Sequence, residues 1–281
     1  MRVVIVGCGY VGSALAVRAK AHHHDVWAVR RSPRGAPAPG VHVVQADASS
    51  GRGLDALPAD VDVVVYAVSP DERSEQAYRA AYPDGVQTVL RTLRPRRFIL
   101  VSSTSVYGES RGEWVDDATP PCPASATGTQ IVAAERLAQE GCAATIIVRP
   151  SGIYGPGRVS LLQRVRGGEA ESPDRPIFTN RIHRDDLAEV LLFTMERPDA
   201  QGVYLATDTE PVELRQLHAW LAERLGVPTP PVVSVSLARG RHRASKRCVP
   251  RRLLEEGYTF LYPTFREGYT AILRDLAAPP R

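Results

Sequence analysis

The chain has 281 residues, of which 43% are hydrophobic and 23% are charged, ordinary values for a globular protein with room for one large and one smaller domain. Its net charge of +4 is small and its basic residues are scattered, so composition does not indicate a nucleic-acid-binding protein. The four cysteines lack metal-ligand spacing, and no apolar run is long enough to span a membrane. We therefore expect a cytoplasmic protein with reduced thiols and without a signal peptide, a metal site or a membrane partner.

The first 20 residues predict a strand, a glycine turn and a helix. Residues 2–6 are mostly β-branched, as in a buried parallel strand, and residues 13–20 alternate apolar and polar side chains with helical period. Gly7, Gly9 and Gly12 stand between them in G-x-G-x-x-G spacing. In a dinucleotide site these glycines allow a tight turn, close approach of a pyrophosphate and close helix–strand packing, respectively. A turn without a ligand is the alternative, but the flanking strand and helix favour a dinucleotide at the helix N-terminus.

The second predicted strand, residues 25–30, ends in a basic pair. Arg30 and Arg31 stand at roughly the 20-residue distance at which NAD sites carry an acidic residue for the ribose and NADP sites carry arginine for the 2′-phosphate. No acidic residue is present here, and Ser32 adds another phosphate donor. The pattern favours NADP over NAD, with ordinary surface arginines as the alternative.

The chain then alternates predicted strands and helices. Further strands are expected at 41–45, 60–67, 97–102 and 144–148, and helices at 72–93, interrupted near Pro83, and at 130–140. This alternation indicates an α/β protein with a Rossmann-type doubly wound parallel sheet. Ligands of such sheets bind at the carboxyl ends of the strands.

Beyond residue 156 the alternation loosens. Helices are expected at 185–195, 212–225 and 265–276, with a short strand at 203–206. We predict an NADP-binding Rossmann domain at 1–157 and a smaller α/β substrate cap at 158–281, with the elements around 180–206 packing back on the Rossmann sheet.

Four segments in the same order resemble the extended and atypical short-chain dehydrogenase/reductases, which are NAD(P)-dependent and epimerase/dehydratase-like. They are VSSTSVYGES at 101–110, RPSGIYGPGR at 149–158, NRIHRDDLAEVL at 180–191 and RASKRCVPRRLLEEGY at 243–258. That family works with a serine and a Tyr-x-x-x-Lys pair, in which the lysine lowers the tyrosine pKa. Here Ser103 stands at the serine position, but Thr127 and Ile131 stand at the tyrosine and lysine positions.

No Tyr-x-x-x-Lys exists anywhere in the chain, whose only lysines are Lys20 and Lys246. The family's helix asparagine aligns with Asp84, as in an atypical subgroup whose catalytic residues are poorly kept. Three groups are candidates for the missing acid: Tyr107, Tyr154 with Arg158 nearby, and Ser103 acting with a water or a substrate group. Both tyrosines have a packing role as the alternative.

From the turn, the strand ends and the resemblance, we predict two sets of site residues. The cofactor-binding residues are Gly7, Gly9, Tyr10, Val11, Gly12, Arg30, Arg31, Ser32, Asp47, Ala48, Ala67, Val68, Pro150 and Ile153. The catalytic residues are Ser103 and Tyr154. The arginines at 241, 243, 247, 251 and 252 suggest an anionic part of a small-molecule substrate, with a solvated basic face as an equal alternative.

Three functions remain open. The first is an NADP-dependent oxidoreductase or epimerase acting on a small polar carbonyl or sugar-like substrate. The second is an enzyme of the same fold that catalyses an isomerisation, elimination or cyclisation without net redox change, and the third is a non-catalytic NADP-binding sensor or partner protein. The sequence fixes no oligomeric state, and a homodimer is one option.

Overall fold

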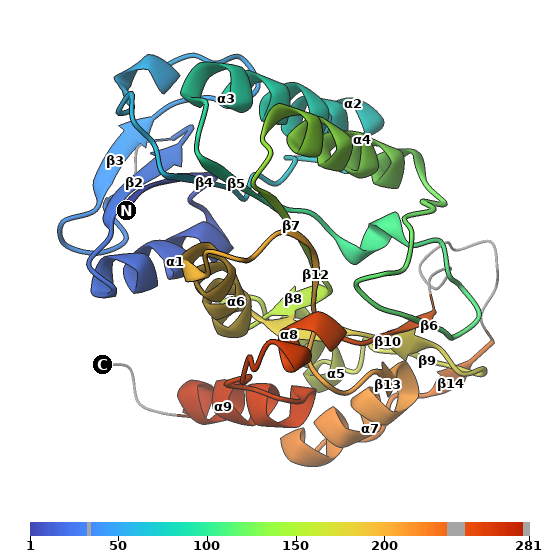
Figure 1. Cartoon of the computed structure of the whole chain (residues 1–281). Coiled ribbons are helices and arrows are strands. Elements are labelled where there is room, and N and C mark those ends of the chain that lie inside the picture. The colour runs from blue at the N-terminus through green and yellow to red at the C-terminus, as the bar shows by residue number, and fades with distance from the viewer. Residues whose placement is uncertain (33–34, 235–244, 278–281) are drawn as a thin grey trace. The chain divides into compact units, whose positions relative to one another are not determined.

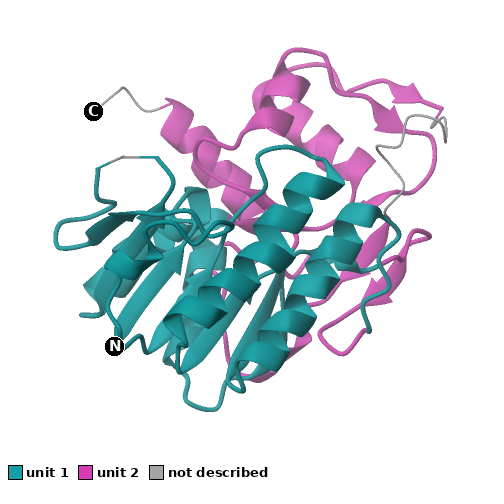
Figure 2. Ribbon diagram, turned by 90° about the horizontal axis from the view of Figure 1, so that it is seen from above, with its two compact units in different colours: residues 1–107, 120–150, 184–206 teal, residues 108–119, 151–183, 207–281 magenta. Residues whose placement is uncertain are grey.

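The protein is described by a computed structural model that covers residues 1–32, 35–234 and 245–277. The chain forms two compact units, each assembled from separate segments (Figure 2). Unit 1 comprises residues 1–107, 120–150 and 184–206, and unit 2 comprises residues 108–119, 151–183 and 207–281. The predicted boundary at 157 differs from this division at 108–119 and 151–157, which belong to unit 2. Residues 184–206 belong to unit 1, in the region expected to pack back on the Rossmann sheet, and the roles of the two domains stay predictions.

Unit 1 is built on a parallel sheet whose described strands number seven, in the order β12-β7-β5-β4-β1-β2-β3. The strands are β1 (Arg2–Val6), β2 (Asp25–Arg30), β3 (His42–Gln45), β4 (Val63–Tyr66), β5 (Arg97–Val101), β7 (Thr145–Pro150) and β12 (Gly202–Ala206). The predicted doubly wound sheet is confirmed. Every residue of β4 and β7 is buried, because both faces of these central strands are covered by helices.

Helices cover both faces of the sheet (Figure 1). On one face lie α2 (Glu75–Arg79), α3 (Gly85–Leu93) and α4 (Ala126–Gly141), and on the other lie α1 (Tyr10–Ala21) and α6 (Arg184–Glu196). Short 3-10 turns occupy Leu54–Ala56 and Thr104–Val106. The edge formed by the carboxyl ends of the strands is therefore bordered by two helical layers.

The interruption predicted near Pro83 is a π-helical segment, Ala80–Asp84, that joins α2 to α3. Within it the amide of Gly85 donates to the carbonyl of Ala80, and the buried Tyr66 hydroxyl donates to the carbonyl of Ala81 at 2.5 Å. A side chain at Gly85 would overlap that hydroxyl, so glycine is required there. The helix thus changes its hydrogen-bond pattern where the last residue of β4 reaches it.

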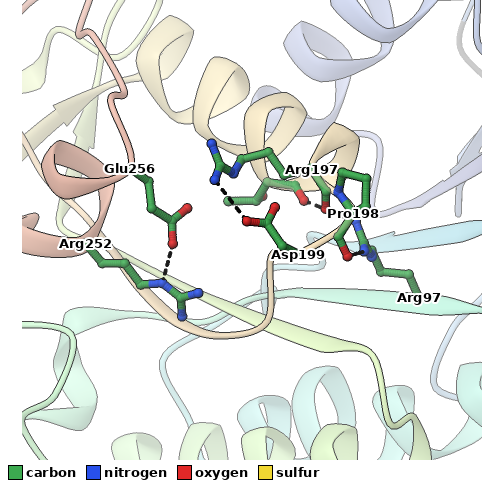
Figure 3. Close-up of polar contacts among 7 residues, drawn as sticks. Arg97, Arg197, Pro198, Asp199, Arg252 and Glu256 are labelled. Atoms are coloured by element: carbon green, nitrogen blue, oxygen red, sulfur yellow. Dashed lines mark hydrogen bonds and ion pairs between the residues drawn. The ribbon is translucent and has the colours of Figure 1, made fainter.

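The end of α6 is held to the start of β5 by one side chain. Arg97 donates to the carbonyls of Met195 at 3.0 Å, Arg197 at 2.6 Å and Pro198 at 2.8 Å (Figure 3). The Met195 carbonyl is one of those that a helix end leaves without intrahelical partners, whereas Arg197 and Pro198 follow the helix directly. A guanidinium at this end also complements the helix dipole. The crossover from α6 to β12 is thereby fixed to the sheet.

Unit 2 contains short strands paired two by two and its own helices. The pairs are β6 (Glu113–Val115) with β15 (Lys246–Cys248), β8 (Gly152–Tyr154) with β11 (Arg181–His183), β9 (Ser172–Pro173) with β14 (Val232–Val233), and antiparallel β10 (Phe178–Thr179) with β13 (Val212–Glu213). The helices are α5 (Ser160–Arg166), α7 (Leu214–Leu225), α8 (Arg251–Glu255) and α9 (Phe265–Ala277). A core that includes Leu162, Leu217 and Phe265 holds α5, α7 and α9 together.

Three findings concern general properties of the chain. Within the three described ranges, no helix has both the length and the apolar character that crossing a bilayer requires. All four cysteines are free thiols. Nor do the described residues contain a group of three or more His, Cys, Asp or Glu side chains suited to a metal ion.

Candidate functional site

Most of the predicted site residues lie along one edge of the parallel sheet of unit 1. The turn from Gly7 to Gly12 follows β1; Arg30 ends β2; Asp47 follows β3; Ala67 follows β4; Ser103 follows β5; and Pro150 ends β7. Because the strands are parallel, these positions meet at the carboxyl edge, where open α/β sheets bind ligands. Ile153 and Tyr154 belong instead to β8 of unit 2.

The first and third glycines are required by close backbone contacts. Gly7 has φ +85°, and a Cβ built on it would lie 2.6 Å from the carbonyl carbon of Ala67 and from the amide nitrogen of Val68. A Cβ on Gly12 would lie 2.8 Å from the carbonyl oxygen of Gly7. The turn after β1 therefore touches the end of β4, and α1 begins directly against the turn.

The second glycine is different, because its surroundings are open. A Cβ on Gly9 would meet only the carbonyl oxygen of Gly7, at 3.9 Å. Gly9 is also the N-cap of α1, so it has no side chain to cap the first amides, and the first turn of α1 has no acidic residue. The amides and positive dipole end of α1 therefore adjoin an open stretch of backbone, which suits the approach of a phosphate.

Arg30 reaches from the end of β2 to the glycine turn. Its guanidinium donates to Ser13 Oγ at 3.0 Å, to the carbonyl of Gly35 at 3.0 Å and to Cys8 Sγ at 3.8 Å. Burial raises the pKa of the Cys8 thiol, although Arg30 and Ser13 act in the opposite direction. Arg30 is thus a fixed cation beside a neutral thiol, and its buried Nε has no hydrogen-bond partner among the described residues.

Arg31 is more exposed and is engaged differently. Its guanidinium forms a two-pronged pair with the carboxylate of Asp71, and its own carbonyl accepts a hydrogen bond from Gln45 at 3.0 Å. Asp47, which follows β3, binds the amide and hydroxyl of Ser49 at 2.9 and 2.7 Å. Burial would raise the pKa of Asp47, but these hydrogen bonds and the charge of Arg31 hold it below its usual range. Local sequence patterns do not indicate the role of Asp71, which depends on this tertiary contact.

Ser103 begins the short turn after β5 and is half-buried. Its Oγ accepts a hydrogen bond from the amide of Ser105 at 3.1 Å, which leaves its own hydrogen unused in that bond. The preceding residue, Ser102, donates to the Glu135 carboxylate at 2.5 Å. The segment that carries Ser103 is therefore attached to α4.

Glu135 belongs to a buried ion pair that motif reading missed. Its carboxylate binds Arg149 of β7 at 2.7 Å, and both side chains are only 4% exposed. Arg149 also donates to the Tyr107 hydroxyl at 3.0 Å. Tyr107 is itself buried, which favours its packing role over a catalytic one. A charged residue inside an otherwise apolar strand was the available signal for this pair.

The two positions aligned with the family's tyrosine and lysine lie on α4. Thr127 is in its first turn, and its hydroxyl lies 3.2 Å from Ser125 Oγ. Ile131 is 1% exposed and contributes to the core of unit 1. The aligned lysine position thus holds a packed apolar side chain, which carries no positive charge. Asp84, aligned with the family's asparagine, pairs with Arg79 at 3.7 Å.

Tyr154 packs inside unit 2. Its ring stacks on that of Tyr269 with 4.7 Å between centroids and meets the His183 ring edge-on at 5.3 Å. Its hydroxyl faces Gly268 of α9, where a Cβ would overlap it and would lie 2.7 Å from the Tyr154 Cζ. This position favours the packing alternative for Tyr154, and its catalytic role stays a prediction.

The described arginines of the C-terminal segment are engaged within unit 2. Arg247 lies over the Phe178 ring at 3.8 Å, Arg251 pairs with Asp116 at 3.0 Å, and Arg252 pairs with Glu256 at 2.7 Å (Figure 3). Arg241 and Arg243 lie outside the described residues. These pairs give the arginines structural partners, and a role in binding an anionic substrate stays a prediction.

A parallel sheet in this strand order with a glycine turn after β1 defines a Rossmann-type α/β protein. Within that class, residues 3–206 match the model of the NAD dependent epimerase/dehydratase family, and the chain belongs to this family. The resemblance inferred from the four sequence segments is thereby confirmed.

Relatives match along nearly the whole chain. Protein YeeZ of Escherichia coli K12 is 27% identical over 278 residues, which cover 93% of this chain and 96% of that protein. A solved structure from Methylobacillus flagellatus, provisionally assigned to the NAD-dependent epimerases/dehydratases, is 32% identical with a TM-score of 0.82 over 99% of both chains. Human epimerase family protein SDR39U1, solved with NADPH, shares the fold with a TM-score of 0.79 at 20% identity, over 98% of this chain and all of that one. The matched proteins include both reductases and epimerases.

The contrast between Gly7 and Gly9 gives a first prediction. Gly7→Ala forces a side chain into the backbone of Ala67 at a positive φ, so we expect it to lower the free energy of unfolding by about 3 kcal/mol or more. Gly9→Ala has room, so we expect nearly wild-type stability and weaker binding of a dinucleotide. Chemical denaturation and a titration with NADPH test both variants. Equal loss of stability in the two variants would contradict this division of roles.

The contact between Tyr154 and Gly268 gives a second prediction. Gly268→Ala overpacks the core of unit 2, and we expect a loss of about 1–3 kcal/mol in the free energy of unfolding. Tyr154→Phe removes the overlapping hydroxyl and should restore part of that loss in the double variant, as measured by urea denaturation. We expect Tyr154→Phe alone to keep its turnover. A large loss of turnover at unchanged stability would assign Tyr154 the proton-donor role instead.

Proposed function

We propose that the chain is an NADP-dependent oxidoreductase or epimerase of the atypical short-chain dehydrogenase/reductase type, acting on a small polar carbonyl or sugar-like substrate. The observation that carries this proposal is the open backbone at Gly9, at the amide end of α1, next to two arginines at the end of β2. The family membership and the NADPH held by human SDR39U1 support a nicotinamide cofactor.

The residues on this edge fit the parts of such a cofactor. The amides of Gly9, Tyr10 and Val11 would bind the pyrophosphate, because Gly9 leaves room for it and α1 supplies its positive end. Asp47 and Ala48 would border the adenine, while Ala67 and Val68 would border the adjoining ribose. Pro150 at the end of β7 and Ile153 in β8 are the remaining predicted contacts.

The choice between NADP and NAD depends on the end of β2. An NAD site places a carboxylate there for the ribose hydroxyls. Arg30 and Arg31 instead offer hydrogen-bond donors and positive charge, and the Ser32 hydroxyl can also donate. Guanidinium groups bind phosphate oxygens in a fork geometry. A 2′-phosphate is therefore the better match for this edge.

Ser103 is the group on the sheet edge best suited to orient a reacting carbonyl. Its Oγ already accepts the Ser105 amide, so its hydrogen is available for donation to a substrate oxygen. When bound, the cofactor would supply or accept a hydride. Because Thr127 and Ile131 replace the usual tyrosine and lysine, we infer that a water or a substrate group moves the proton.

The buried apolar residue at position 131 also favours a second candidate function. Without a cation near the reacting hydroxyl, the same fold could retain NADP while catalysing a non-redox isomerisation, elimination or cyclisation. A non-catalytic NADP-binding sensor is the third candidate. Incubation with NADPH and a panel of carbonyl compounds separates them: falling NADPH absorbance supports the first, conversion at constant absorbance the second, and binding without turnover the third.

Charge reversal at the end of β2 tests the cofactor assignment. In Arg31→Asp we expect NADPH affinity to fall about 10- to 100-fold, because a charged hydrogen bond to phosphate is lost, while NADH affinity is kept or rises. Reversing Arg30 as well should invert the preference, although Arg30 also supports the glycine turn. Arg96→Asp is the matched control, because Arg96 is exposed and precedes β5 at the opposite edge. An unchanged NADPH preference in the double variant would contradict the assignment.

Removal of one hydroxyl tests the role of Ser103. We expect Ser103→Ala to lower turnover about 100-fold, because a donor to the substrate oxygen is lost, without changing NADPH affinity. Ser105→Ala is the control, since Ser105 binds Ser103 through its backbone amide, which the substitution keeps. Rates are measured by NADPH absorbance on the substrate found in the panel. Full turnover in Ser103→Ala would exclude this role.

A further inference from the structure

The Arg31–Asp71 pair spans the carboxyl edge of the sheet. Arg31 follows β2, and Asp71 lies in the loop after β4. These strands flank β1 in the sheet, so the pair connects loops on either side of the strand that leads into the glycine turn. It lies entirely within unit 1.

The pair uses the same atoms that a 2′-phosphate would need. Arg31 Nη1 donates to one oxygen of the Asp71 carboxylate at 2.6 Å, and Nη2 donates to the other oxygen. The Arg31 hydrogen bonds hold the pKa of Asp71 below its usual range, so Asp71 is an anion at neutral pH. A carboxylate and a phosphate bind the guanidinium fork in the same way and cannot both occupy it fully.

Exposure makes this pair easy to replace. The side chains of Arg31 and Asp71 are 56% and 68% exposed, so water and salt weaken their attraction. The buried Glu135–Arg149 pair, only 4% exposed on each side, would be costly to open. Arg31–Asp71 and Glu135–Arg149 thus differ in how easily a competing anion could open them.

We propose that Asp71 is an internal competitor of the cofactor's 2′-phosphate: it holds Arg31 before NADP binds, is displaced when NADP binds, and so reduces the preference for NADP over NAD. This inference rests on the proposed function. Asp71 is therefore a residue that determines cofactor specificity without taking part in hydride transfer or substrate binding.

Displacement of Asp71 affects a short segment only. On one side, the amide of Ala67 donates to the carbonyl of Val6 at 2.8 Å. On the other side, the N-cap hydroxyl of Ser74 accepts the amide of Ala77 at 3.1 Å and donates to Glu72 at 2.7 Å. The loop can release Arg31 while both of its ends stay attached to β1 and α2.

Calorimetric titrations with NADPH and NADH test the proposal on the full chain. We expect Asp71→Asn to bind NADPH about three- to fivefold more tightly than wild type, because an exposed ion pair that competes for Arg31 is weak and its loss has a modest effect. We expect the affinity for NADH to stay unchanged. Asp60→Asn is the matched control: it removes one exposed carboxylate paired with an arginine, but precedes β4 at the opposite edge. We expect no change in this control.

A double-variant cycle separates competition from general repulsion. In an Arg31→Gln background, Asp71→Asn should no longer alter NADPH affinity. Equal tightening in that background, or unchanged or weaker NADPH binding in Asp71→Asn alone, would overturn the proposal. Failure of wild type to bind either nucleotide would instead overturn the proposed function, so the two failures are distinguishable.

Discussion

The approach of one backbone segment to another at Gly7 is the constraint on which the sheet edge of unit 1 depends. The turn after β1 touches the chain at Ala67 and Val68, directly after β4, with no room for a side chain. The amides of Gly7 and Cys8 also bind the carbonyl of Val29 near the end of β2, at 3.2 and 3.0 Å. One turn thus fixes the relation between three neighbouring strand ends, and α1 starts from it. The positions of Gly9 and Arg30 on that edge follow from these contacts.

Charge along the edge is distributed according to burial. Arg30 donates hydrogen bonds to Ser13 and to a backbone carbonyl, so it forms part of the glycine turn. Arg31 is exposed to solvent and pairs with the carboxylate of Asp71. Deeper in the unit, Glu135 and Arg149 attach α4 to β7, and Ser102 joins the same carboxylate. The sequence contains no Tyr-x-x-x-Lys, and the segment that carries Ser103 is attached to α4 through the hydrogen bond from Ser102 to Glu135.

Local patterns were sufficient to predict the central sheet and the helices α7 and α9, but insufficient to predict the short strands of unit 2. The predicted bounds of β2 agree with the observed ones, because residues typical of a strand are followed there directly by residues typical of a turn. Strands such as β10 and β13 have two residues each, too few to show a period, and their partner lies over 30 residues away. The strand pair β6–β15 joins residues more than 130 positions apart, which no local pattern encodes. For the site, the glycine turn and Arg30 were visible in the sequence, but the partner of Arg31 and the packing of Tyr154 against α9 depend on tertiary contacts.

The discontinuous make-up of unit 1 has a consequence during synthesis on the ribosome. Strand β7 is buried along its full length and needs β12, residues 202–206, as its outer neighbour, while α1 packs with α6. The sheet therefore cannot be completed until much of unit 2 has also left the ribosome, because residues 108–119 and 151–183 are made first. A nascent chain released near residue 157 would expose the edge of β7 and one side of α1, so unit 1 is expected to complete its fold only after residues 184–206 have been made.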